Sequence, residues 1–451
     1  MTETIVALAT PNSRSALGMI RVSGRIVLEL CEKSCGLPSP TPRCAHLTKY
    51  TSLDQNILDQ IIMVYYEEGR SFTGENCMEL TCHGNPIVLE EILNDLIHRG
   101  CRMANPGEFS YRAFQNGKID LSQAEAIADL IGAKNKQALF LANKNLDGNL
   151  SKKIDYLQDS ILKQLSDIEA FIDFPEDDLG KENTKQIITN LQKICSELLR
   201  LIEVGKKTAI FNRKLKVVLV GPPNAGKSSI FNNIIGLDRA IIDQKPGTTR
   251  DFIDYNINLG KINIQLYDTA GIRETNEEIE IQGIERTYQL VKDADLVLLV
   301  LDRSLPYPSI IDHDIKNGIK DKKTILVLNK SDLQNKINIT GSHLDEVSKT
   351  EVSVKNEGSM LNLTNQITNC LLEDSLVENE FNLSVNLRQS NALSNALVYI
   401  KNSIDIIMSE KAIEFAITDL KESISLLGEI VGNKDNEDML DLLFSNFCIG
   451  K

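Results

Sequence analysis

GPPNAGKSS, residues 221–229, indicates the fold of the central part of this 451-residue chain. The stretch satisfies G-x-x-x-x-G-K-[ST], follows the apolar run KVVLV and precedes SSIFNNIIG, which is typical of a helix. A glycine-rich loop between a strand and a helix is a phosphate-binding loop, in which Gly221 and Gly226 let backbone N–H groups surround phosphate oxygens. We expect Lys227 to bring charge to the β- and γ-phosphates and Ser228 to offer a hydroxyl to Mg²⁺.

Two further motifs follow this loop in a fixed order. DTAG, residues 268–271, ends the strand-like run INIQLYD, and NKSD, residues 329–332, ends KTILVLN. A carboxylate at Asp332 can accept hydrogen bonds from both N1–H and the 2-amino group of guanine, a donor pair that adenine lacks. The motif therefore predicts GTP rather than ATP, with SVK at 353–355 closing over the base. Ordinary turn residues at strand ends do not explain three motifs in this order.

The residues around these motifs raise the question of how GTP is hydrolysed. GTTRD, residues 247–251, lies where a GTPase keeps its switch threonine, so we expect Thr249 to be a second Mg²⁺ ligand. Ile272 follows the DTAG glycine, where Ras-like enzymes have a glutamine that orients water. Another group must do this, and the residues alone do not choose among the acids of the next segment: Glu274, Glu277, Glu278, Glu280 and Glu285. Asn224 is either a turn former or a ligand for a monovalent cation.

Patterning on either side of the motifs predicts a multidomain α+β protein. Residues 1–118 mix short apolar runs with Gly/Pro turns, which indicates a small N-terminal α+β domain. Residues 119–212 and 376–451 repeat apolar residues every three or four positions, as helices do, and Ser122 with Glu125 fits a capping box. Between them, residues 213–375 alternate strands and helices. We expect a central helical domain interrupted by an inserted α/β P-loop GTPase (G) domain.

Composition excludes several classes of protein. The start MTETIVALATPNSR lacks the layout of a secretory signal, and no apolar run approaches the roughly 20 residues of a membrane span. Nine cysteines without a C-x-x-C pair indicate reduced thiols, so we expect a cytoplasmic protein without a membrane. The net charge is −14, which predicts no long phosphate-binding surface for nucleic acid.

The whole chain resembles the tRNA modification GTPase family MnmE, also called TrmE. The resemblance rests on these stretches: TIVALATP, IRVSG, SFTGEN, CHGNP, NPGEFSYRAFQNGKIDLSQAEAIADLI, IDFPED, GPPNAGKSS, PGTTRD, DTAGIRET, GIERT and the terminal FCIGK. Other GTPases share only the central motifs, so the combination is specific to this family.

The resemblance implies roles for residues in the central domain. In this family the G domains dimerise across the nucleotide with K⁺ as the activating charge, and the resemblance implies the same for this chain. Asn224, Asp243, Lys245 and Thr248 match the K⁺ positions, and Glu280 matches the glutamate that orients the attacking water. The expected GTP-binding residues are Asn224, Ala225, Gly226, Lys227, Ser228, Ser229, Asp243, Gln244, Lys245, Pro246, Gly247, Thr248, Thr249, Asp268, Thr269, Ala270, Gly271, Asn329, Lys330, Ser331, Asp332, Ser353, Val354 and Lys355.

The resemblance also implies a second ligand and several partners. Arg21, Glu79, Lys118 and Lys451 match positions that contact 5-formyl- or 5,10-methylene-tetrahydrofolate, and the N-terminal domain is expected to form a homodimer. The family works in a heterotetramer with the flavoprotein MnmG, which supplies FAD and NADH. Together they add an aminomethyl or carboxymethylaminomethyl group to C5 of the tRNA wobble uridine. Cys448 is a candidate for catalysis or for packing.

Two alternatives belong to other functional classes. A ribosome-assembly or other RNA-binding switch GTPase would need a basic module after the G domain, yet residues 376–451 carry 6 basic and 12 acidic side chains. A membrane-remodelling GTPase would need a lipid-binding basic or apolar surface, and no such stretch is present in the sequence. We therefore expect a GTP-hydrolysing enzyme of tRNA modification.

Overall fold

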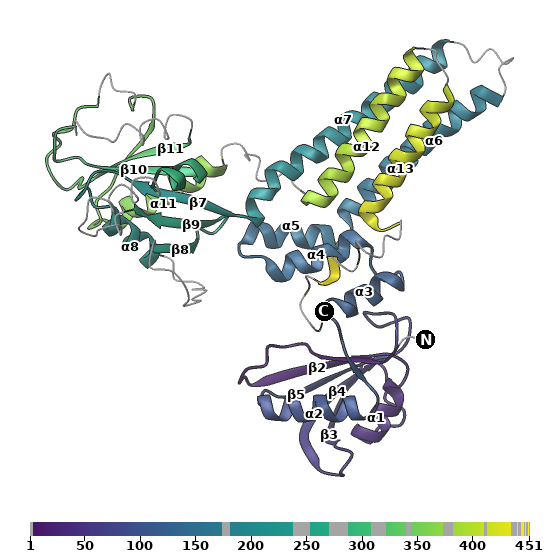
Figure 1. Ribbon diagram of the computed structural model, residues 1–451. Helices are drawn as coiled ribbons and strands as arrows, with labels where there is room; N and C mark the ends of the chain where they lie inside the picture. The colour runs from purple at the N-terminus through teal and green to yellow at the C-terminus, as the bar shows by residue number, and fades with distance from the viewer. Residues whose placement is uncertain are drawn as a thin grey trace. The chain divides into compact units, whose positions relative to one another are not determined.

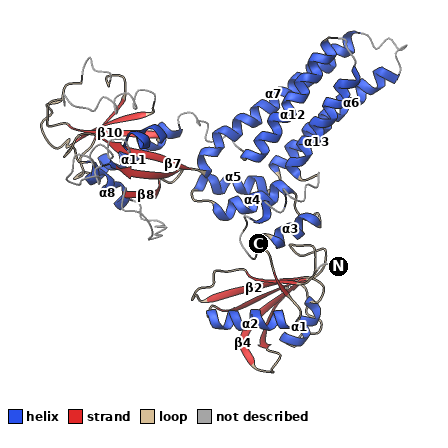
Figure 2. Cartoon of the chain, in the orientation of Figure 1, coloured by secondary structure: helices blue, strands red, loops and turns tan. Residues whose placement is uncertain are grey.

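The computed structural model describes residues 3–173, 181–237, 253–269, 287–307, 322–339, 344–372, 382–409, 413–433, 440, 443–445, 447 and 450. The chain divides into two compact units. One contains residues 1–131, 145–198 and 391–451, and the other contains residues 132–144 and 199–390. Strands occur in two separate sheets, and the longest helices lie outside both of them (Figure 2).

The sheet of the second unit carries the three sequence motifs. Its strands are β7 (Lys214–Val220), β8 (Ile253–Asn258), β9 (Asn263–Asp268), β10 (Leu296–Asp302), β11 (Thr324–Asn329) and β12 (Ser348–Glu351). Their order is β12-β11-β10-β7-β9-β8, and only β8 runs antiparallel to its neighbour. The helices α8 (Lys227–Leu237) and α11 (Glu357–Leu372) belong to the same unit. All seven residues of β10 are buried, as expected of a central parallel strand covered on both faces.

The N-terminal sheet belongs to the first unit. Its strands are β1 (Ile5–Leu8), β2 (Leu17–Ser23), β3 (Ala45–Thr51), β4 (Ile57–Tyr66), β5 (Cys77–His83) and β6 (Arg102–Met103), in the order β3-β4-β5-β2-β1-β6. Helices α1 (Val27–Cys35) and α2 (Pro86–His98) cover one face of this sheet (Figure 1), and Val22, Met63 and Leu89 share the apolar core on that side. A shorter helix, α3 (Glu108–Gln115), contributes Phe109 to a separate cluster with Ile5 and Ala7 of β1.

Long helices form where the apolar spacing predicts them. They are α4 (Leu121–Gly132), α5 (Lys136–Leu146), α6 (Asn149–Asp173), α7 (Lys181–Asn212), α12 (Leu387–Met408) and α13 (Ile413–Val431). In α6 the residues at three- and four-residue spacing, among them Ile154, Leu157 and Ile161, are fully buried. This helix packs along α13, where the Gln158 amide donates to the Ile424 carbonyl at 2.9 Å.

The start of α4 differs from the sequence expectation. Its capping box is formed by Asp120 and Gln123, whose side chains accept from each other's backbone N–H at 2.8 and 3.0 Å. The expected pair of Ser122 and Glu125 was therefore wrong. The helix begins at Leu121, so Ser122 already lies in its first turn, where its buried side chain cannot act as the cap.

The division into compact units also differs from the expected domain boundaries. Residues 132–144 and 199–212, expected in the helical domain, fall in the compact unit of the G-domain sheet, as do residues 376–390. Ala138 of α5 and Phe211 of α7 belong to the apolar core of that sheet, which explains why residues 132–144 and 199–212 fall in its unit.

Candidate functional site

The loop after β7 has the backbone of a phosphate-binding loop. Gly221 and Gly226 have φ values of +146° and +98°, and Asn224 has φ +62°. A Cβ on Gly221 would lie 2.1 Å from the Val300 carbonyl oxygen, and one on Gly226 would lie 2.1 Å from Nδ2 of Asn329. Both positions therefore require glycine for space as well as for φ.

The side chain of Lys227 lies over this loop. Its Nζ donates to the carbonyls of Gly221 and Pro222 at 2.8 and 3.0 Å, and the residue is only 7% exposed. Ser228 and Ser229 follow it in the first turn of α8 and are exposed. The N–H groups and the positive dipole end of a helix favour an anion at this point. The loop, Lys227 and α8 thus offer a cradle that fits a polyphosphate.

The carboxyl ends of the parallel strands bring the second and third motifs to the loop. Asp268 ends β9 and is 3% exposed, and Thr269 donates through Oγ1 to the Leu219 carbonyl at 2.7 Å. Asn329 ends β11 and is 2% exposed, and its Nδ2 donates to the Ala225 carbonyl at 2.9 Å. Asn329 of the NKSD motif therefore fixes the phosphate-binding loop by this hydrogen bond.

Asp332, the carboxylate expected to bind the guanine base, is held by the segment SVK, residues 353–355. Asp332 accepts from Ser353 Oγ at 3.0 Å and from Lys355 Nζ at 2.9 Å. The hydrogen bond from Lys355, followed by that from Ser353, lowers the pKa of Asp332. Asp332 is exposed. Val354, which lies in the sequence between Ser353 and Lys355, is partly buried against the apolar core. Lys330 has φ +60° and pairs with Asp302. This geometry suits a carboxylate that receives two donors from guanine.

The other candidates of the G domain lie outside the described residues. They are Asp243, Gln244, Lys245, Pro246, Gly247, Thr248, Thr249, Ala270, Gly271 and Glu280. Cys448 and Lys451 of the C-terminal segment also lie outside them.

A second site forms on the face of the N-terminal sheet opposite α1 and α2. Arg21 and Glu79 are direct cross-strand partners, and Arg21 donates through Nε and Nη2 to Glu79 Oε1 at 2.9 and 2.7 Å. Tyr66 donates to the other carboxylate oxygen at 3.2 Å, and the ring of Phe109 lies 5.9 Å from the guanidinium carbon. The Arg21 and Glu79 side chains are 19% and 20% exposed. The sequence contained no signal for Tyr66 and Phe109, since only the fold brings the end of β4 and the start of α3 to this pair.

The C-terminal segment reaches this second site. Arg21 Nη1 donates to the Gly450 carbonyl at 3.3 Å, and a Cβ on Gly450 would meet the backbone of Leu8 and Ala9. Phe444 and Phe447 have ring centroids 5.1 Å apart and belong to an apolar cluster with Leu121. The aromatic residues of this segment are therefore docked on the protein, and they bring Gly450 beside Arg21.

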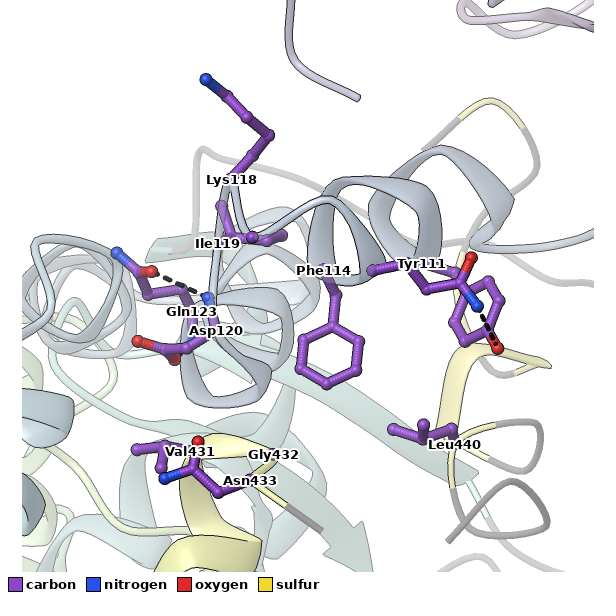
Figure 3. Close-up of a pocket in the computed structure, with 12 residues that line it drawn as sticks. Tyr111, Phe114, Lys118, Ile119, Asp120, Gln123, Val431, Gly432, Asn433 and Leu440 are labelled. Carbon is purple, nitrogen blue, oxygen red and sulfur yellow. Dashed lines mark hydrogen bonds between the residues drawn. The ribbon is translucent and has the colours of Figure 1, made fainter. Parts of the chain in front are cut away.

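Lys118 lies on the rim of a separate pocket. A cavity of about 730 Å³ opens beside the end of α3, the start of α4 and the end of α13, with Phe114, Asp120 and Asn433 in its wall (Figure 3). The Lys118 amino group points away from those residues in Figure 3 and donates to the Gly69 carbonyl at 2.9 Å. The structure thus brings Arg21 and Glu79 together, whereas Lys118 contacts a different loop.

A buried polar network supports the N-terminal loop SFTGEN, residues 71–76. Arg112 of α3, 5% exposed, donates to Glu75 at 2.9 Å and to Glu108 at 2.8 Å. Ser23 donates to Glu75 at 2.7 Å and shares a hydrogen bond with Thr73 at 2.8 Å. Sequence reasoning missed these residues because no local pattern links strand β2 to helix α3.

Metal-binding clusters and membrane spans are both absent from the ranges that the structure describes. No group of three or more His, Cys, Asp or Glu side chains there is arranged to hold a metal ion. No helix in those ranges is long and apolar enough to cross a bilayer.

Comparison with known proteins agrees with the expected resemblance over the whole chain. Residues 121–448 match the family described as MnmE helical domain, and residues 4–118 match the GTP-binding protein TrmE N-terminus. The tRNA modification GTPase MnmE of Opitutus terrae is 38% identical over 100% of this chain and 99% of its own length. The protein of the same name from Aquifex aeolicus is 38% identical over 100% of both chains.

A solved structure adds a more distant similarity. The G domain of the FeoB iron transporter of T. maritima is 24% identical over 36% of this chain and 99% of its own, with a TM-score of 0.25. The expected multidomain α+β fold is confirmed by the two matched domains and the two sheets. The chain therefore belongs to the MnmE (TrmE) family of tRNA modification GTPases.

Proposed function

We propose that this chain is a GTP-hydrolysing enzyme of tRNA modification that acts on the wobble uridine. With the flavoprotein MnmG as partner and source of FAD and NADH, it adds a carboxymethylaminomethyl or aminomethyl group to C5 of that base. The observation that carries the proposal is the Asp332–Ser353–Lys355 arrangement beside the phosphate-binding loop, in a chain with full-length relatives named tRNA modification GTPase MnmE.

The described residues supply binding and orientation of GTP. The loop N–H groups and Lys227 hold the β- and γ-phosphates, and Asn329 keeps the loop closed on them. Asp332 selects guanine by accepting from N1–H and the 2-amino group. Ser228 and Thr249 would hold Mg²⁺, which neutralises charge on the β- and γ-phosphate oxygens when bound. The exposed Ser228 hydroxyl at the start of α8 fits this role.

Ile272 cannot orient the attacking water, and Glu280 is proposed for this role because it matches the glutamate that has it in the MnmE family. In a Glu280→Ala variant GTP affinity should stay normal while turnover falls by roughly 10²-fold, the range of a lost general base. Single-turnover hydrolysis and nucleotide titration measure the two quantities separately. Normal turnover in the variant would refute this assignment.

Asn224, Asp243, Lys245 and Thr248 are proposed to hold K⁺, whose charge would activate hydrolysis across a dimer of G domains. Asn224 is exposed on the phosphate loop with φ +62°, a conformation that asparagine adopts more readily than most residues. Its position on this loop supports the proposal. Hydrolysis rates in KCl and NaCl at equal ionic strength test the role, and equal rates in the two salts would remove it.

We also propose that the N-terminal domain binds a formyl- or methylene-tetrahydrofolate through Arg21, Glu79, Lys118 and Lys451. A carboxylate such as Glu79 pairs well with the donor edge of a pterin, and Arg21 suits the glutamate tail. The fit is supported by the partly exposed Arg21–Glu79 pair with Phe109 beside it. Titration of 5-formyltetrahydrofolate into the wild type and an Arg21→Ala variant tests it, and equal affinities would argue against the site.

A homodimer through the same domain is proposed from the open face of its sheet. Leu47, Ile62, Thr81 and Met19 are successive cross-strand partners on that face, and Leu47 and Ile62 are 70% and 44% exposed. Exposed apolar rows of this kind often mark an association surface. Sedimentation of the wild type against an Ile62→Asp variant measures it, and an unchanged dimer in the variant would argue against this face.

The boundaries 1–118, 119–212 with 376–451, and 213–375 remain the proposed domains, and a cytoplasmic location is proposed with them.

Cys448 is proposed either to react or to pack. A Cys448→Ser chain that keeps GTP hydrolysis but loses modification would favour chemistry, and retained modification would favour packing.

The whole proposal is tested by nucleoside analysis of tRNA from cells that lack this chain. We expect wobble uridine without its C5 substituent, restored by the wild-type chain, and unchanged ribosome profiles. Normal uridine modification with accumulated ribosome precursors would instead support the alternative, a ribosome-assembly or other RNA-binding switch GTPase.

A further inference from the structure

The β8–β9 hairpin of the second unit extends from the edge of the sheet that carries DTAG to the start of α5. At one end, Ile253 of β8 pairs with Asp268 of β9, the first residue of DTAG. At the other end, Asn258 pairs with Asn263 and a turn containing Gly260, at φ +83°, closes the hairpin. Six residues per strand at about 3.3 Å each give a ladder about 20 Å long.

The closed end of the hairpin is tied to the segment before α5. Oδ1 of Asn258 accepts from the N–H of Gly260 at 2.7 Å, while Nδ2 of the same amide donates to the Lys134 carbonyl. The Lys136 N–H donates to the Gly260 carbonyl at 3.4 Å. The Asn258 side chain therefore stabilises the turn through its oxygen and binds the segment before α5 through its nitrogen.

That segment is itself fixed beside the start of the sheet. Asn135, 6% exposed, caps α5 by accepting from the Ala138 N–H at 2.8 Å and donates to the Phe211 carbonyl at 2.7 Å. Phe211 lies in the last turn of α7, shortly before β7, and packs with Ala138 in the same core. Hence the start of α5 contacts both the hairpin and the end of α7, the helix that precedes the strand leading to the phosphate-binding loop.

We infer that Asn258 is a positioning residue that transmits the nucleotide state of the G domain to α5. The inference rests on the proposed GTP-dependent function, in which Asp268 and its neighbours respond to the γ-phosphate and Mg²⁺. β9 is hydrogen-bonded along its length to β8 on one side and to β7 on the other, so we expect a shift at Asp268 to be carried along the hairpin to Gly260 and, through Asn258, to the backbone at Lys134. By linkage, the position of α5 biases nucleotide affinity in return.

The test uses amide hydrogen exchange of the full chain with GDP and with the imido analogue GppNHp, both with Mg²⁺ and K⁺. In the wild type, amides of Lys136–Leu139 should exchange at rates that differ between the two nucleotides. In Asn258→Ala this difference should shrink, since only the Lys136–Gly260 backbone bond still joins the hairpin to α5. Exchange there should rise by roughly fivefold, the factor of one neutral hydrogen bond. Exchange in α8 should still respond to the nucleotide.

Two further variants separate transmission from turn formation. Asn258→Asp keeps an oxygen for the Gly260 N–H but loses the donor to Lys134, so it should behave like Asn258→Ala. Asn256→Ala, an exposed position of the same strand, should behave like the wild type. Slow exchange of the β10 and β11 amides confirms folding of each variant.

The outcomes distinguish this inference from the proposed function. A nucleotide response of wild-type size at α5 in Asn258→Asp would overturn it, because the side chain would then only shape the turn. A wild type whose α8 responds while α5 does not would also overturn it and leave GTP binding intact. A wild type that responds to neither nucleotide anywhere would refute the proposed function together with the inference.

Discussion

Gly226→Ala tests the reasoning about the phosphate-binding loop most directly. The new Cβ would lie 2.1 Å from Nδ2 of Asn329, a distance that real Cβ atoms do not tolerate. Asn329 is 2% exposed and donates to the Ala225 carbonyl at 2.9 Å, while its Oδ1 has no hydrogen-bond partner within the described structure. The amide would have to leave this position and lose its bond.

The size of the effect follows from two contributions. A non-glycine residue at φ +98° costs about 1–3 kcal/mol in backbone strain. Loss of the hydrogen bond with a buried amide left behind costs about 1–3 kcal/mol more. The G-domain sheet should therefore be destabilised by about 2–6 kcal/mol. Nucleotide affinity should also fall, because the loop can no longer close against Asn329.

The assay compares this variant with a matched one in the same segment. Gly236 of α8 has open space where a Cβ would be added, so Gly236→Ala should change stability by about 1 kcal/mol or less and in the favourable direction. Native-state hydrogen exchange of β10 and β11 in urea gives the opening free energy, and fluorescent GDP gives the affinity. Equal stability and affinity in the two variants would refute the steric argument.

Three other outcomes are expected. Asp332→Asn should weaken GTP binding at least about a hundredfold and favour xanthosine triphosphate, whose C2 oxygen accepts from the new amide, and competition titration measures the preference. Phe444→Ala should destabilise docking of the C-terminal segment by about 3–5 kcal/mol, seen as faster exchange at Phe447, with no change in β10. Burial, followed by the charge of Glu125, raises the pKa of Asp129 from 3.8 to about 6, so folded stability should fall as pH rises between about 4 and 6. Asp129→Asn should remove that slope and raise the melting temperature at about pH 7.5 but not at about pH 4; an identical slope in the variant would contradict the assignment.

Asp129 holds its proton more tightly in the folded protein than in the unfolded chain. An acid whose folded pKa exceeds its unfolded value binds more protons when folded, so protonation favours the native state. Above about pH 6 the folded state carries a poorly solvated charge, and a neutral amide of the same shape avoids it. Calorimetry across this pH range measures both the slope and the gain in the variant.

Local patterns in the sequence determined much of this protein. The order of the phosphate loop, DTAG and NKSD predicted the parallel sheet and the edge at which their side chains meet, because parallel strands all end at the same edge. The three- and four-residue spacing of apolar residues predicted α6, α7, α12 and α13, because that period places them on one helix face. These features depend on residues close together in the chain.

Which distant segments meet became evident from the folded chain alone. The Arg21–Glu79 pair gains Tyr66, Phe109 and the Gly450 carbonyl from three other segments, and no period in the sequence encodes those contacts. In the same way α5 has an ordinary helical pattern, yet its Ala138 and Leu141 belong to the apolar core of the G-domain sheet. An apolar face specifies that it will be buried, but its partner is selected by shape and chain connectivity, which exist only in the folded molecule.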